Sequence, residues 1–217
     1  MPQIDPEAAQ TWHFPINESE RTYQFDIVKR CLHENCLVTL PTGLGKTFIA
    51  AVVMYNYYRW YPRGKTVFLA PTRPLVSQQI EAVQELVEIA EDDLAELTGS
   101  ILPSVRESCW EHKRALFMTP QILHNDLLTG SCSAKDIVLV VIDEAHKASG
   151  KHAYCEVIRQ IYQVNPEFRI LALTATPAVS KSSVQSLLDN LQISHIEFRT
   201  ENSSDVHPYF FQRNSRS

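Results

Sequence analysis

Residues 41–47 carry the residue types that bind the phosphates of a nucleotide. The heptapeptide PTGLGKT follows an apolar run at 36–40 and precedes a segment with helical character. Its two glycines allow the backbone to turn tightly and to present N–H groups to phosphate oxygens, and the start of a helix adds further donors. In such a loop the lysine reaches the β and γ phosphates of ATP, and the threonine hydroxyl binds Mg²⁺. We therefore predict that ATP contacts Thr42, Gly43, Leu44, Gly45, Lys46 and Thr47.

A second set of reactive side chains, the tetrapeptide DEAH at 143–146, follows the apolar run IVLVVI. This places a carboxylate at the carboxyl end of a buried strand, where open α/β sheets bind their ligands. Asp143 is expected to hold Mg²⁺ through water, since this ion usually keeps several of its waters. Glu144 is expected to orient or deprotonate the attacking water. The predicted catalytic residues are Lys46, Asp143 and Glu144, and the predicted metal ligands are Thr47 and Asp143.

Two kinds of segment alternate along the chain and must position these groups. Short apolar or β-branched runs, typical of strands covered on both faces of a parallel sheet, occur at 36–40, 66–70, 115–118, 137–142 and 169–174. Segments with helical spacing occur at 47–60, 74–88, 103–112, 121–128 and 152–163. The alternation predicts an α/β fold, a three-layer sandwich with a mostly parallel central sheet and helices on both faces.

The composition is that of one globular domain. The chain has 217 residues, of which 44% are hydrophobic and 21% are charged. No apolar run approaches the roughly 18 residues that a membrane-spanning helix needs, so we expect no membrane partner. The formal net charge of -5 argues against binding nucleic acid by bulk attraction, so phosphate contacts must come from individually placed groups. We predict an N-terminal arm at 1–17, an ATP-binding domain at 18–199, and a linker at 200–217, where the composition becomes polar.

The phosphate loop departs from the general G-x-x-x-x-G-K-[ST] pattern, because Leu40 stands where the first glycine is expected. Followed by a proline, this is the form seen in helicase superfamily 2, and the chain resembles the first RecA-like domain of such a helicase. The resemblance implies that a Q-type motif reads the adenine through Arg21, Tyr23 and Gln24. It implies that coupling to a second motor domain and to the nucleic acid depends on His146, Thr174, Ala175 and Thr176.

Three further short motifs appear in the order found in this superfamily. They resemble motif Ia, motif Ib and the strand-end loop that follows, all of which lie against the nucleic-acid backbone in such helicases. Their placement is more specific than any single three-residue match. The residues that the resemblance places at the nucleic acid are Pro71, Thr72, Arg73, Thr98, Gly99, Thr119, Pro120 and Gln121.

The amino-acid sequence within and around the motifs resembles that of one group of this superfamily. PTGLGKTFIA, APTRPLVSQQ and VIDEAHKASG resemble the Fanconi anaemia group M and archaeal Hef group of DNA translocases, with their fungal relatives, over roughly residues 20–200. The resemblance implies ATP-driven movement on duplex or branched DNA, remodelling of forks and Holliday junctions in DNA repair, and a nuclear location. Two alternatives stay open: a duplex-RNA-dependent ATPase of the Dicer and RIG-I type, and a nucleotide-binding interaction module without turnover.

Motifs IV to VI of this group are not found in the 217 residues. Motif VI supplies an arginine finger, which in related NTPases increases the rate by about 10³- to 10⁵-fold. We therefore expect the chain to work with the second RecA-like domain and the helical insert of a longer parent. By itself it is expected to bind nucleotide but to hydrolyse ATP poorly.

Overall fold

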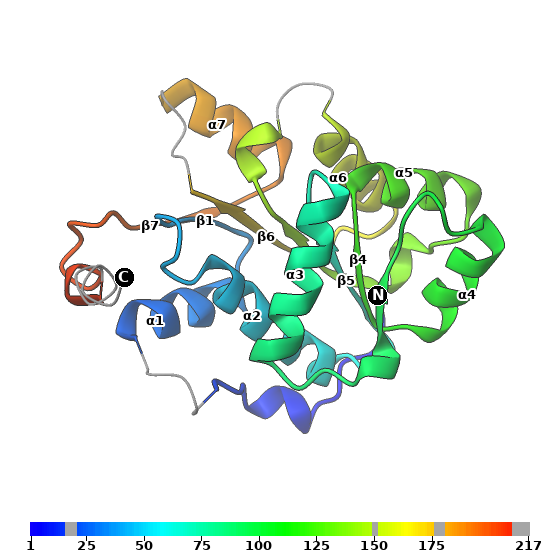
Figure 1. Cartoon of the computed structure of the whole chain (residues 1–217), viewed down its shortest axis with the longest axis horizontal. Coiled ribbons are helices and arrows are strands. Elements are labelled where there is room, and N and C mark those ends of the chain that lie inside the picture. The colour runs from blue at the N-terminus through cyan, green and yellow to red at the C-terminus, as the bar shows by residue number, and fades with distance from the viewer. Residues whose placement is uncertain (16–20, 149–151, 176–180, 210–217) are drawn as a thin grey trace.

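Seven strands in the described part of the chain form one sheet in the order β3-β4-β2-β5-β6-β1-β7 (Figure 1). The structure, a computed structural model, describes residues 1–15, 21–148, 152–175 and 181–209. Each pair of neighbouring strands is parallel. The strands are β1 (Cys36–Thr39), β2 (Lys65–Leu69), β3 (Leu94–Glu96), β4 (Ala115–Met118), β5 (Ile137–Ile142), β6 (Arg169–Thr174) and β7 (His195–Phe198).

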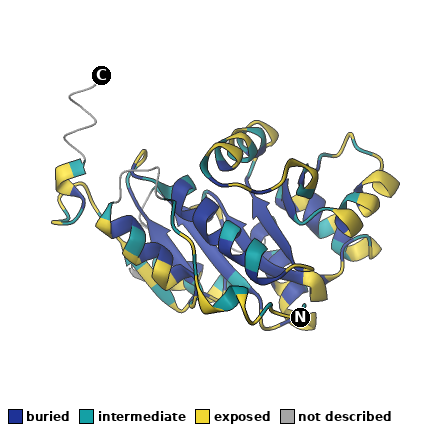
Figure 2. Cartoon of the chain, turned by 90° about the horizontal axis from the view of Figure 1, so that it is seen from below, coloured by how far each residue is buried: buried dark blue, intermediate teal, exposed yellow. Residues whose placement is uncertain are grey.

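Helices cover both faces of this sheet, so that the buried strands lie between two helical layers (Figure 2). The helices are α1 (Thr22–Cys31), α2 (Lys46–Trp60), α3 (Arg73–Leu86), α4 (Pro103–His112), α5 (Pro120–Thr129), α6 (Ala153–Val164) and α7 (Lys181–Asn190). Helices α1 to α3 pack into the hydrophobic core on one face, and α4 to α7 pack into the core on the other. None of the helices in the described ranges is long and apolar enough to cross a membrane.

The predicted three-layer α/β sandwich with a parallel sheet is confirmed. The five predicted strands correspond to β1, β2, β4, β5 and β6, and the five predicted helices correspond to α2 through α6. The elements α1, β3, α7 and β7 were not predicted. β3 has only 3 residues, and β7 lies at the sheet edge with no buried residue, so neither carries the continuous apolar run that marks an inner strand.

The two chain ends pack against the domain where the structure describes them. Thr11 in the N-terminal segment accepts a hydrogen bond at its carbonyl oxygen from Trp60 Nε1 on α2 at 2.9 Å. The buried Asn56 amide donates to the His13 carbonyl oxygen at 2.9 Å and accepts from the His13 N–H at 2.7 Å. In the segment after β7, Val206 is fully buried in the core formed with α1 and α2. Because these ends are mostly polar in composition, the sequence gives no indication that they pack against the domain.

Candidate nucleotide and nucleic-acid site

The sheet topology brings the predicted motifs to a single edge. Because all paired strands are parallel, their carboxyl ends lie on the same side, where α/β sheets bind ligands. The strand order divides this edge into two halves. The loops after β1, β5 and β6 carry the predicted ATP and coupling residues, at 41–47, 143–146 and 174–175. The loops after β2, β3 and β4 carry the predicted nucleic-acid residues, at 71–73, 98–100 and 119–121. Thr176 lies outside the described residues.

The phosphate loop depends on glycine at two positions. Gly43 and Gly45 have φ values of +83° and +101°, a region that other residues rarely adopt. A Cβ atom added to Gly45 would also lie 2.2 Å from Gln24 Nε2, so a larger residue here would displace the Gln24 side chain. Between them the Leu44 side chain is buried, which fixes the loop to the core.

The predicted adenine-reading residues lie directly against this loop. Tyr23 Oη donates to the Leu44 carbonyl oxygen at 2.7 Å, and Gln24 Nε2 donates to the same oxygen at 3.1 Å. Arg21 Nη1 donates in turn to Tyr23 Oη at 3.2 Å. Tyr23 and Gln24 are both buried, so their side chains are held in these positions. The structure therefore joins the Q-type residues to the phosphate loop through one backbone carbonyl.

The side chains of Lys46 and Thr47, which are expected to contact phosphate and metal, each donate a hydrogen bond to another group of the protein. Lys46 Nζ donates to the Leu40 carbonyl oxygen at 2.9 Å. Burial lowers the pKa of Lys46, and the negative charges of Asp143 and Glu144 partly oppose this shift. Thr47 Oγ1 donates to Gln79 Oε1 at 3.0 Å. Gln79 is on α3, and no spacing in the sequence indicates that it reaches the loop.

Asp143 is a buried carboxylate at the end of β5, with 8% of its surface exposed. Burial raises the pKa of Asp143, and the neighbouring charge of Glu144 contributes in the same direction, although Lys46 and a hydrogen bond from the Glu144 backbone oppose the shift. An ionised carboxylate is costly to bury unless a cation or donor compensates it, so this site fits a bound Mg²⁺. Tyr154, which is on α6, donates from its Oη to the Asp143 carbonyl oxygen at 2.7 Å, and this bond holds the turn after β5 in place.

Glu144 has an unusual backbone conformation for a residue that is not glycine. Its φ and ψ are 52° and 44°, in the left-handed region, immediately before the short turn Ala145–Lys147. Such strain is found where the surrounding structure holds a functional side chain in place. His146 Nε2 lies 3.4 Å from Glu144 Oε2, and His146 Nδ1 lies 3.0 Å from Thr174 Oγ1. The structure therefore brings together three of the predicted residues at the ends of β5 and β6.

The predicted nucleic-acid residues form loops that face solvent on the other half of the edge. Thr72, Arg73, Gly99 and Gln121 are exposed, and Pro71, Thr98 and Thr119 are partly exposed. Arg73 Nη2 lies 3.5 Å from Ser100 Oγ, which is 2.8 Å from Thr98 Oγ1, so the first two loops are in contact. Pro120 is the exception. It is buried at the first residue of α5, so its ring does not face solvent.

Comparison with known proteins shows the family of the chain. A model of the family described as "Type III restriction enzyme, res subunit" matches residues 17–179. The chain belongs to this family. The match includes the phosphate loop and the DEAH tetrapeptide, and it extends over both halves of the strand-end edge.

The chain is also similar to individual members and to a solved structure. It is 53% identical over 212 residues to the protein named "DEAD-box ATP-dependent RNA helicase FANCM" of Arabidopsis thaliana, covering 97% of this chain and 16% of that protein. It is 49% identical over 207 residues to "ATP-dependent DNA helicase fml1" of Schizosaccharomyces pombe, covering 95% of this chain and 25% of that protein. The structure of the Pyrococcus furiosus Hef helicase domain aligns with a TM-score of 0.82 and 40% identity, covering 88% of this chain and 40% of that one. The resemblance to the Fanconi anaemia group M and Hef group is therefore confirmed, and the chain spans a minor part of each of these relatives.

Proposed function

We propose that this chain is the ATP-binding motor domain of an ATP-dependent DNA helicase or translocase that remodels branched DNA during repair in the nucleus. One observation carries the proposal: a phosphate loop, an acidic motif that begins with the buried Asp143, and three solvent-facing loops share one edge of a parallel sheet. A motor needs a nucleotide site and a nucleic-acid contact on one rigid body. The Schizosaccharomyces pombe relative is named an ATP-dependent DNA helicase, which favours DNA as the nucleic acid.

ATP and Mg²⁺ are the proposed cofactors, bound between the ends of β1 and β5. These strands are separated only by β6, and at ~4.8 Å between neighbouring strands the gap is about 10 Å. When ATP binds, Lys46 Nζ is proposed to give up its hydrogen bond to the Leu40 carbonyl oxygen and to contact the β and γ phosphates instead. Thr47 and Asp143 are proposed to hold the Mg²⁺ ion, which neutralises phosphate charge when it is bound. Glu144 then orients the attacking water and accepts its proton.

The Q-type residues support both ends of the nucleotide in this proposal. Gln24 faces the loop at Gly45, and the adenine is proposed to bind beside its amide. Because Tyr23 and Gln24 also hold the Leu44 carbonyl, recognition of the base and of the phosphates acts on the same backbone segment. A base that contacts Gln24 therefore favours the loop conformation that receives phosphate.

Coupling between ATP and nucleic acid is proposed to depend on the end of β6. His146 contacts both Glu144 and Thr174, so a change at the water-orienting carboxylate is transmitted to the neighbouring strand end. The exposed loops at 71–73, 98–100 and 119–121 are proposed to lie against the DNA backbone. Arg73 is the charged side chain among the predicted contacts there, which agrees with binding by placed groups in a chain of net charge -5.

The relatives are several times longer than this chain, so we propose that the motor is completed by a second RecA-like domain and a helical insert in the full-length protein. An arginine from that second domain is proposed to stabilise the charge of the transition state. The 217 residues alone are accordingly proposed to bind ATP and to turn it over slowly.

The test measures ATP binding by the chain and ATP hydrolysis by the full-length protein. Lys46→Ala and Asp143→Ala are expected to abolish hydrolysis, and forked DNA is expected to stimulate the wild type more than duplex RNA does. The Arabidopsis relative carries the name of an RNA helicase, so duplex RNA is the informative competitor. Equal or stronger stimulation by RNA would establish the Dicer-like alternative. Tight ATP binding with no turnover of the full-length protein on any nucleic acid would establish the non-catalytic module.

A further inference from the structure

The segment that follows β7 returns to the nucleotide half of the site. Val206 is fully buried in the core on the face covered by α1 to α3, and Tyr209 is partly buried against the same core. The Tyr209 ring centroid lies 5.8 Å from that of Tyr23, with the two ring planes at 58°. An aromatic side chain from this polar segment therefore lies beside a residue of the Q-type motif.

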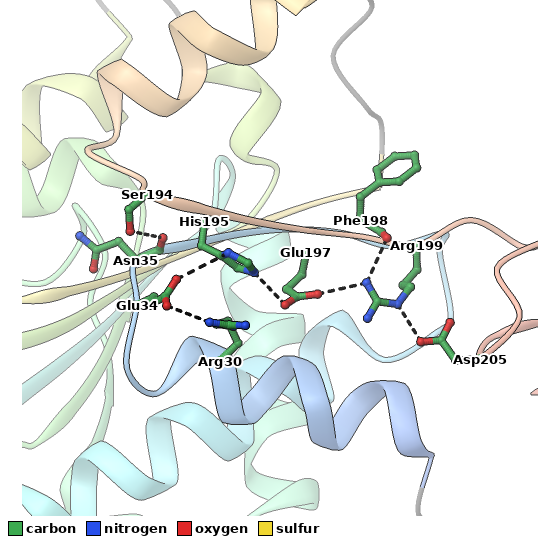
Figure 3. A network of polar contacts seen from close by, with 9 residues as sticks. All are labelled: Arg30, Glu34, Asn35, Ser194, His195, Glu197, Phe198, Arg199 and Asp205. Atoms are coloured by element: carbon green, nitrogen blue, oxygen red, sulfur yellow. Dashed lines mark hydrogen bonds and ion pairs between the residues drawn. The ribbon is translucent and has the colours of Figure 1, made fainter.

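Ion pairs hold the start of this segment in place (Figure 3). Arg199 Nε lies 2.8 Å from Asp205 Oδ2, which closes the turn, and Arg199 Nη1 lies 3.0 Å from Glu197 Oε2 on β7. Glu197 also contacts His195 at 2.8 Å, His195 lies 3.5 Å from Glu34 in the turn after α1, and Glu34 lies 3.0 Å from Arg30 on that helix. The network ties the turn to β7 and to α1, and with the buried Val206 it sets the position from which Tyr209 reaches the site.

Arg21 connects Tyr209 to the phosphate loop. Its guanidinium carbon lies 5.3 Å from the centroid of the Tyr209 ring, within the range of a cation–π contact. The same guanidinium donates to Tyr23 Oη, and Tyr23 Oη donates to the Leu44 carbonyl oxygen. Two side chains, those of Arg21 and Tyr23, therefore link Tyr209 to the loop at 41–47. No motif in the sequence indicates this link, because residue 209 lies in the segment predicted to be a linker.

We propose that Tyr209 and Arg21 together form the surface on which the adenine of the bound nucleotide stacks. This inference rests on the proposed binding of ATP and names the residue that recognises the base from outside the Q-type motif. An aromatic ring and a guanidinium plane both stack favourably on a nucleobase. The Arg21 carbonyl oxygen accepts from the Gln24 N–H at 2.9 Å, and the Arg21 guanidinium contacts the Tyr209 ring, so the pair adjoins the residue proposed to read the base. Tyr209 is thus a binding residue for the base and contributes little to the phosphates.

The experiment compares a ligand with a base and one without. The affinities of the 217-residue chain for Mg²⁺–ATP and for inorganic tripolyphosphate are measured by calorimetry for wild type, Tyr209→Ala and Tyr209→Phe. Tyr209→Ala is expected to weaken ATP binding by about 5- to 150-fold, the range of a lost aromatic stack, with tripolyphosphate binding unchanged. Tyr209→Phe is expected to bind both ligands as the wild type does. Tyr162→Ala, an exposed tyrosine on α6, is the control for loss of a surface ring.

Each result decides the question. If Tyr209→Ala weakens ATP and tripolyphosphate equally, or leaves ATP binding unchanged, the stacking role is wrong and the ring serves packing alone. If the wild type binds tripolyphosphate but gains nothing from the base, this inference fails while the phosphate loop stands. If the wild type binds neither ligand, the proposed function itself fails. Thermal melting of each variant identifies a loss of affinity that comes from unfolding.

Discussion

The left-handed backbone of Glu144 leads to a prediction about stability that can be separated from catalysis. A residue with a Cβ atom in this conformation costs the folded state about 1–2 kcal/mol, and glycine adopts it freely. Glycine also loses more chain entropy on folding than alanine does, by about 0.5–1 kcal/mol. The difference predicts that Glu144→Gly is more stable than Glu144→Ala by about 0.5–1 kcal/mol. At an ordinary helical position the order of the two variants is reversed.

Urea unfolding of the two variants measures this difference, provided that both give the same slope with denaturant. For a chain of this size it corresponds to a rise of about 1–4 °C in melting temperature. Both variants lose the contact with His146 equally, so that contact cancels in the comparison. Glu156 on α6 is the matched control, because its side chain is 42% exposed and it lies in a regular helix. Glu156→Gly is expected to be less stable than Glu156→Ala, and the same order at residue 144 would refute the strain argument. ATP hydrolysis by the full-length protein is expected to be lost in both variants of Glu144.

Three other perturbations test the site and the core. Because burial raises the pKa of Asp143, the stability that its neutral form provides is full below the ordinary value of 3.8 and is lost as the pH rises through the raised value. Asp143→Asn cannot ionise and is expected to exceed the wild type in unfolding free energy at pH 8, with the advantage disappearing below pH 4; an advantage that is independent of pH would contradict this. Lys46→Ala is expected to weaken ATP binding at least about 10-fold, a loss of roughly 1.4 kcal/mol, with little change in melting temperature, and unchanged affinity would remove Lys46 from the site. Asp126→Asn breaks a buried pair in which Arg106 Nη2 lies 3.0 Å from the carboxylate, so unfolding is expected to become easier by about 3–5 kcal/mol, and a loss below 1 kcal/mol would show that the pair is dispensable.

The parts of the fold that sequence reasoning could predict are those specified by local pattern. The inner strand IVLVVI is apolar at every position because helices cover both faces of the sheet, and its burial follows directly from that pattern. The edge strand β7, HIEF, lacks such a run because no strand in the described part of the chain borders one of its sides, and its side chains are at least partly exposed. Prediction therefore succeeded in the interior of the sheet and failed at its margins.

The candidate site divides in the same way. Lys46, Asp143 and Glu144 lie in short contiguous motifs, and the residue types of these motifs are enough to predict their roles. Tyr154 and Tyr209 contribute through contacts with the Asp143 carbonyl and with Arg21, which form only after distant segments pack together. A single sequence holds no local signal for such contacts, because their partners are brought together by the tertiary fold.

The strand order also explains how the two halves of the edge can communicate. β2, which leads to the loop at 71–73, pairs directly with β5, which leads to Asp143. The Asp143 N–H donates to the Leu69 carbonyl oxygen at 2.9 Å, so the backbone of the acidic motif is bonded to the last residue of β2. If nucleotide binds as proposed, a shift of Asp143 is therefore expected to act on a strand end two residues from Pro71. On the other side, His146 ties the same motif to Thr174 at the end of β6. The acidic motif is thus bonded through β2 to the half of the edge predicted to contact nucleic acid, and through His146 to the predicted coupling residue Thr174 on β6. The proposed motor requires this position of the residues that sense ATP.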